Sequence, residues 1–222
     1  MYIPDSYRGD ERNAVELMQR YPLALMMSGS HDGLPFATHL PTVIPPDTAE
    51  ALSAGTAPLA GISIFGHLNR SNPHWQALQD GGQALLVFSG PNSYISPTLY
   101  DPGPAAPTWN FISVHARGSV RPIVDRDQTL DVIRRTVTSM ETAFGGGWDM
   151  TGSLEYFDRI VSGVGAFELK IETVDCMMKL SQEKNLATRQ QVIEGLSRQE
   201  GSVRDICHWM KRSVQSDLSG NA

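Results

Sequence analysis

The residues best suited to bind an anion are Arg70 and Asn72, which lie in the segment Gly66–Pro73. Asn72 followed by Pro73 predicts the start of a helix, because asparagine caps free backbone N–H groups and proline fits the first turn. Arg70 comes just before this helix, so its guanidinium and the free N–H groups would point toward the same anion. An arginine paired with a surface carboxylate is an equally good interpretation of this segment.

Two polar clusters form a second candidate site, Ser93–Ser96 and Thr108–Asn110. Apolar strands are predicted over Ala84–Phe88 and Trp109–Ala116, and the Pro-, Gly- and Ser-rich chain between them favours an irregular connection. Five prolines stiffen this connection and its aromatic residues must pack, so we expect an ordered loop that brings both clusters to one ligand. A packed loop without a ligand is the alternative.

Histidines offer a third kind of chemistry. His39 lies in a strand predicted over Pro35–Ile44, where alternation sends Thr38 and Leu40 to one face and His39 to the other. A single strand histidine is more often a hydrogen-bonded residue than a catalyst. No cysteine or carboxylate pattern accompanies His67 and His74, so the sequence predicts no metal site.

Strands mixed with peripheral helices are predicted to position these residues. An Asp-Gly turn at His31-Asp32-Gly33 predicts a hairpin between two strands, and the segment from Pro45 to Pro58 is predicted to be a loop. The final helix pair lacks the basic recognition face of a DNA-binding helix-turn-helix. The predicted strands are 23–28, 35–44, 59–65, 83–89, 109–120 and 163–173, and the predicted helices are 11–20, 72–79, 125–143, 155–160, 186–196 and 203–214.

Composition limits the classes of protein to which the chain can belong. With 222 residues, of which 41% are hydrophobic and 19% charged, it is an ordinary globular sequence that we expect to form one domain with a C-terminal appendage. The net charge of −6 argues against direct DNA binding, which depends on Lys and Arg. Two cysteines without C-x-x-C spacing, no apolar membrane span and no signal peptide predict a cytoplasmic protein without membrane contact.

Several short motifs occur in order along nearly the whole chain. They are MYIP at the start, Ala37–Pro41, Gly66-His67 with Asn72-Pro73 and Trp75, Ser89-Gly90-Pro91 with Tyr94–Pro97, Pro107–Asn110 with Val114-His115, and Lys179–Gln182. Taken together, they resemble the PaiB-type FMN-binding split-barrel proteins, a family described as negative transcriptional regulators. That resemblance implies an α+β fold: an antiparallel split β-barrel of the pyridoxamine-phosphate-oxidase-like class with peripheral helices.

The resemblance also implies a homodimer with FMN, the small-molecule ligand, in clefts between subunits. It assigns residues 1–180 to the FMN-binding barrel and residues 181–222 to a C-terminal helical extension packed on it. Glu183 departs from the family pattern, which has asparagine there, and its carboxylate would repel a phosphate. The implied cofactor-binding residues are Thr38, His39, Leu40, His67, Asn69, Arg70, Asn72, Tyr94, Ser96, Trp109, Asn110, Lys179, Ser181 and Gln182.

Three functions remain open from the sequence. The first is an FMN-binding regulator with possible flavin redox activity. The second is an oxidoreductase acting on a small planar metabolite with FMN, or with haem bound through His39 or His67. The third is a DNA-binding repressor, which the charge disfavours.

Overall fold

The computed structural model of the chain describes residues 1–29, 33–55, 57–100, 103–199 and 203–219. The chain divides into two compact units. The barrel unit comprises Glu11–Phe88 and Val114–Val174, and the tail unit comprises Met1–Asp10, Ser89–Ser113 and Asp175–Ala222. The domain boundary expected at residue 180 stays a prediction.

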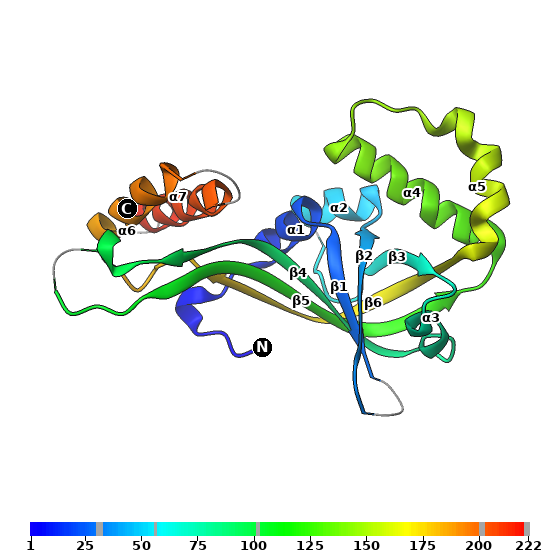
Figure 1. Cartoon of the computed structure of the whole chain (residues 1–222), viewed down its shortest axis with the longest axis horizontal. Coiled ribbons are helices and arrows are strands. Elements are labelled where there is room, and N and C mark those ends of the chain that lie inside the picture. Colours follow the sequence, from blue (N-terminus) through cyan, green and yellow to red (C-terminus); the bar gives the residue numbers. More distant parts are fainter. Residues whose placement is uncertain (30–32, 56, 101–102, 200–202, 220–222) are drawn as a thin grey trace. The chain divides into compact units, whose positions relative to one another are not determined.

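Six strands form a closed antiparallel barrel in the order β1-β2-β3-β6-β5-β4 (Figure 1). β1 pairs with both β2 and β4, and β3 pairs with both β2 and β6. This confirms the predicted α+β fold, an antiparallel barrel with peripheral helices. The strands are β1 (Leu23–Ser28), β2 (Phe36–Val43), β3 (Ser63–Asn69), β4 (Gly82–Ile95), β5 (Thr108–Ile123) and β6 (Val164–Lys179).

The β1–β2 hairpin sets the direction in which the β2 side chains point. Its register pairs Met26 with Thr38, so the two strands align without a bulge at this position. Alternation along β2 buries Leu40, leaves Thr38 half-buried and exposes His39, as the sequence pattern predicted. The predicted turn residues His31 and Asp32 lie outside the described residues.

Helices of the barrel unit cover the barrel strands. α1 (Glu11–Arg20) has the predicted bounds, and α4 (Arg126–Phe144) begins after Asp125, whose Oδ1 accepts a hydrogen bond from Gln128 N at 2.9 Å. The buried face of α4 includes Leu130 and Ile133, which pack with residues of α5 and the turn that follows it, and Figure 1 shows α4 and α5 side by side. The remaining helices are α2 (Pro46–Ser53), α3 (Pro73–Ala77), α5 (Leu154–Ile160) and the 3-10 turns Met150–Ser153 and Val161–Gly163.

Three local predictions differ from the structure. The strand predicted over 59–65 is displaced to Ser63–Asn69. The segment predicted as a loop from Pro45 to Pro58 contains α2, because Pro46 fits a first helical turn and Leu52 is buried against the unit. The irregular connection predicted to follow Phe88 starts only after Ile95. Along this part of β4 the side chains of Ser93 and Ile95 are buried, and Tyr94 between them is exposed. Strand pairing therefore overrides the local Pro and Gly content.

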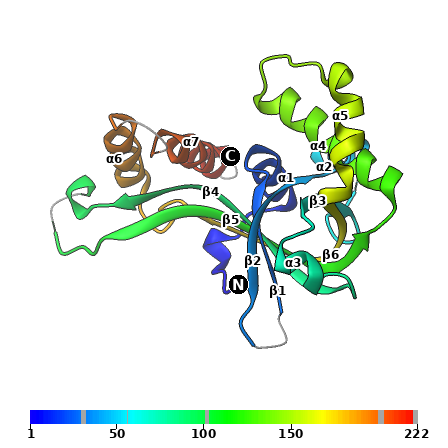
Figure 2. The same cartoon turned by 45° about the vertical axis from the view of Figure 1, so that its right-hand side comes forward.

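The tail unit contains two helices that pack on each other, α6 (Leu186–Ser197) and α7 (Val203–Ser219), which are neighbours in Figures 1 and 2. Arg189, 3% exposed, forms an ion pair with Asp217 and donates to Ser213 Oγ at 2.9 Å. The apolar residues Ile206, Trp209 and Met210 of α7 are buried. This unit also contains the 3-10 turns Asp5–Tyr7 and Pro97–Leu99. In the described part of the chain, no helix is long and apolar enough to cross a membrane.

Candidate functional site

A groove of about 400 Å³ lies on the barrel unit, where β2, β3, the start of α3 and the start of β6 meet. Pro41 and Leu68 contribute apolar wall, and the backbone at Gly163 and Val164 closes one side. The structure therefore brings together six of the seven cofactor-binding residues predicted in this unit, although they come from two strands and a helix cap. These six are Thr38, His39, Leu40, His67, Asn69 and Asn72.

Asn72 connects the α3 cap to this groove. Its Oδ1 accepts a hydrogen bond from His74 N at 2.9 Å, as the cap prediction requires, and its Nδ2 donates to Thr38 Oγ1 at 3.4 Å. Trp75, 4% exposed, fixes α3 against β6, because a Cβ at Gly165 would lie 2.4 Å from its ring. The absence of a side chain at Gly165 thus allows α3 to place Asn72 at the groove.

His74 is a residue of this region that sequence reasoning missed. Its ring is fully buried, stacks on Phe36 at a centroid distance of 5.2 Å, and has Nδ1 2.9 Å from Thr38 Oγ1 and Nε2 2.9 Å from Ser28 Oγ. A neutral imidazole donates from one nitrogen and accepts at the other, so His74 orders both hydroxyls. Burial lowers the pKa of His74, which favours this neutral form. Ser28 and His74 are 46 positions apart, and no local signal pairs them.

His67 provides the groove with an unsatisfied polar atom. Its Nδ1 is buried and has no hydrogen-bond partner among the described residues, and burial lowers the pKa of His67. Such an atom costs free energy unless a ligand or water supplies a partner, so a ligand of the groove that bonded this nitrogen would remove that cost. His39, also in the groove, is exposed. In the described residues no three His, Cys, Asp or Glu side chains gather to hold a metal ion.

Arg70 lies behind the wall of the groove. Its Nε donates to Val164 O at 2.8 Å, its backbone N donates to Gly163 O at 2.9 Å, and its guanidinium carbon lies 5.9 Å from the centre of the Trp75 ring. No carboxylate of the described chain lies within ion-pair distance of Arg70, so the surface-pair interpretation has no support there. Its terminal nitrogens retain donors for an anion. Asn69, which is exposed, accepts a hydrogen bond from Ser71 N at 2.8 Å.

A second cavity, of about 420 Å³, lies in the tail unit. Three of the predicted residues line it: Tyr94, Ser96 and Trp109. The Tyr94 and Trp109 rings meet edge to face at 6.1 Å and are 49% and 53% exposed, so each offers a ring surface to solvent. Lys179 Nζ donates to Thr108 Oγ1 at 2.5 Å.

Asn110 and Ser181 form a pair in the core of the tail unit, where both are fully buried. Asn110 Nδ2 donates to Ser181 Oγ at 2.8 Å and also contacts Met210 Sδ at 3.6 Å. Ser181 has a φ of 66°, a conformation rare for a residue other than glycine, and the pairing helps to hold it. Contact of either residue with a cofactor stays a prediction.

Gln182 supports the same turn after β6. Its Oε1 accepts from Leu180 N at 2.6 Å and its Nε2 donates to Met178 O at 2.5 Å, so both ends of the amide are used by the backbone. Glu183, the departure from the family pattern, is exposed and accepts a hydrogen bond from Tyr7 OH at 3.0 Å. The three residues at the end of the predicted set, Lys179, Ser181 and Gln182, thus all have partners within the tail unit.

Comparisons with known proteins agree with the motifs. Residues 1–173 match the family model described as "Putative FMN-binding domain". The protease synthase and sporulation protein PAI 2 of Bacillus subtilis is 27% identical over 98% of this chain and 100% of its own length.

Two solved structures share the fold. A conserved hypothetical protein of Mycobacterium tuberculosis superposes with a TM-score of 0.57 and 9% identity, over 83% of this chain and 94% of that one. An FAD- and heme-binding protein of Mycobacterium smegmatis gives a TM-score of 0.55 and 13% identity, over 84% of this chain and 79% of that one. The match over residues 1–173, together with the barrel, shows that the chain belongs to the FMN-binding domain family, as a split-barrel protein of the PaiB type.

Proposed function

We propose that the chain binds FMN in the groove formed by β2, β3 and the start of α3. The observation that carries this proposal is the buried Nδ1 of His67, which no described residue bonds, in a groove lined by Thr38, Asn69 and Asn72. A flavin ring presents several hydrogen-bonding atoms on a flat apolar body, and the groove combines polar atoms with the apolar walls of Leu40, Pro41 and Leu68. Membership in the FMN-binding family supports the same ligand.

The phosphate of FMN needs cationic and amide donors. The side-chain amides of Asn69 and Asn72 line the groove, and Arg70, held on Val164 O next to it, would extend its terminal nitrogens toward the phosphate, while Thr38 and His67 are available to the ring. His74 keeps Thr38 oriented by its hydrogen bond. When bound, FMN supplies hydride or single-electron transfer, and the protein supplies binding, orientation and electrostatics.

The biological role proposed here is that of the PaiB type: a flavin-binding homodimer that acts in negative regulation of transcription. The groove is open, and a second copy covering it would exclude water from a bound flavin. The net charge of −6 favours regulation without direct DNA contact. Tyr94, Ser96 and Trp109 are proposed as further contacts because their cavity exposes two aromatic rings.

A haem- or flavin-dependent oxidoreductase acting on a small planar metabolite is the second candidate. The observation that favours it is the presence of two imidazoles, His39 and His67, in one groove, since imidazole nitrogen is a common axial ligand of haem iron. The Mycobacterium smegmatis structure with the same fold is that of an FAD- and heme-binding protein.

An absorbance scan of the purified protein, followed by mass identification of whatever heat releases, separates these candidates. Flavin absorbance with release of FMN is the expected result. A Soret band would favour the haem candidate, and failure of the colourless protein to bind added FMN would end the first proposal. Sedimentation analysis with and without FMN tests the dimer, and a monomer in both states would remove it.

A further inference from the structure

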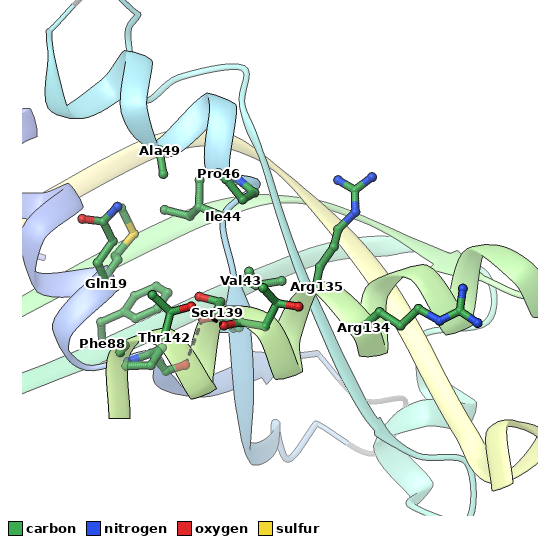
Figure 3. Close-up of a pocket in the computed structure, with 15 residues that line it drawn as sticks. Gln19, Val43, Ile44, Pro46, Ala49, Phe88, Arg134, Arg135, Ser139 and Thr142 are labelled. Carbon is green, nitrogen blue, oxygen red and sulfur yellow. Dashed lines mark hydrogen bonds between the residues drawn. The ribbon is translucent and has the colours of Figure 1, made fainter. Parts of the chain in front are cut away.

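A separate cavity of about 540 Å³ lies in the barrel unit between α1, α2 and α4, and shares no residue with the flavin groove. Its volume falls within the range of roughly 300–1,000 Å³ typical of small-molecule sites. Met18, Val43 and Phe88, all buried, contribute to its floor. Figure 3 shows Ile44 and Ala49 on one side of the space, opposite Ser139 and Thr142.

The charged residues that line this cavity are arginines. No aspartate or glutamate lines it, and both charged lining residues, Arg134 and Arg135, are arginines of α4 with exposed side chains. In Figure 3 both side chains extend outward, away from the space between the other labelled residues. Arg135 Nε lies 2.7 Å from Asp131 Oδ2, whereas Arg134 has no ion-pair partner in the described chain. Two cations at this rim are notable in a chain whose net charge is −6.

We propose that this cavity binds a free, single-chain carboxylate amphiphile, of the class of medium-chain fatty acids. The alkyl chain occupies the apolar floor, where its burial provides the hydrophobic part of the affinity. The carboxylate lies at the rim, where the flexible Arg134 side chain, which has no ion-pair partner in the described chain, turns toward it, and Arg135 donates from the nitrogens that its ion pair with Asp131 leaves free. The site would give a protein of this family a means to respond to a ligand other than its flavin.

Titration of the purified chain with decanoate, followed by calorimetry, tests the proposal. Saturable binding of one decanoate per chain is expected, with uncharged decanol binding more weakly. Replacing both cations in Arg134→Gln/Arg135→Gln should weaken decanoate by about 10- to 100-fold and abolish the preference over decanol. Arg159→Gln on α5, an equal charge change away from the cavity, should leave binding unchanged.

A second variant tests the location of the alkyl chain. Ala49→Trp fills the space opposite Ser139 and should reduce decanoate affinity by about tenfold or more, whereas Ser53→Trp, exposed on the same helix and outside the cavity, should not. No binding to the wild-type chain, or equal binding to Ala49→Trp, would overturn the proposal. Co-sedimentation with phosphatidylglycerol vesicles that depends on both arginines would identify a membrane surface instead, and would equally overturn it.

Discussion

The groove between β2 and β3 in the barrel unit and the Asn110–Ser181 pair in the tail unit contain the same kinds of polar residue. The two regions differ in whether these polar groups have hydrogen-bond partners. In the pair, each side chain is fully buried and bonded to the other. In the groove, His67 has a buried nitrogen without a partner among the described residues, and His39 and Asn69 are exposed. Polar groups that satisfy one another stabilise a fold, whereas those left unsatisfied are available to a ligand. Both sets belong to the cofactor-binding residues expected from the family, and the geometry separates their roles.

The largest expected effect is the loss of stability when the Asn110–Ser181 pair is broken. Asn110→Ala would leave Ser181 Oγ buried without its partner and create a small cavity, so we expect the free energy of unfolding to fall by about 2–3 kcal/mol. Urea unfolding measures this. Asn69→Ala is the matched control, because it makes the same substitution at an exposed position of the groove. It should lower the free energy of unfolding by less than about 0.5 kcal/mol. Equal losses for the two variants would contradict the comparison.

Arg70→Ala tests the groove from the side of the phosphate. Loss of a charge-assisted hydrogen bond should weaken FMN binding by about 1.5–3 kcal/mol, measured by quenching of flavin fluorescence. Arg159→Ala, which removes an exposed arginine of α5, serves as the control. Unchanged FMN affinity in Arg70→Ala would remove Arg70 from the site.

His67→Phe separates binding from stability most clearly. Because Nδ1 has no partner in the described chain, replacing the imidazole by an apolar ring should leave the free energy of unfolding unchanged or slightly raised. FMN affinity should fall by about 0.5–1.5 kcal/mol, the contribution of one hydrogen bond. A strongly destabilised variant would show that His67 holds the fold rather than the ligand.

Acidification should produce the smallest effect. Burial lowers the folded-state pKa of His67 and His74 below the ordinary 6.5, so the unfolded chain binds more protons in acid. Their contribution to stability is therefore complete above pH 6.5 and is lost as the pH falls through the folded-state pKa values. Urea midpoints of the FMN-free protein at a series of pH values test this, and His74→Gln should show a shallower dependence.

The sequence predicted the features of the fold that depend on residues close together in the chain. The bounds of α1 and the caps at Asn72 and Asp125 depend on nearby residues, and all three are found. α2 was missed because Pro45 and Pro46 are typical of loops, although Pro46 also fits a first helical turn. The extension of β4 to Ile95 was missed because pairing with distant strands decides it.

The resemblance to the family predicted the residues that line the candidate site, but not their contacts with one another. The family motifs placed six residues that the structure gathers in one groove. They could not show that His74 orders Thr38, since that contact joins residues 36 positions apart. Nor could they show that Asn110 and Ser181 face each other in a core, because burial is a property of the folded chain.

A crystal structure of the protein grown with FMN tests the central claim most directly. We expect the flavin to lie against β2 and β3, with a hydrogen bond to His67 Nδ1 and the phosphate within reach of Arg70 and Asn72. A flavin bound elsewhere, or a groove filled by side chains with His67 Nδ1 bonded to protein, would contradict it.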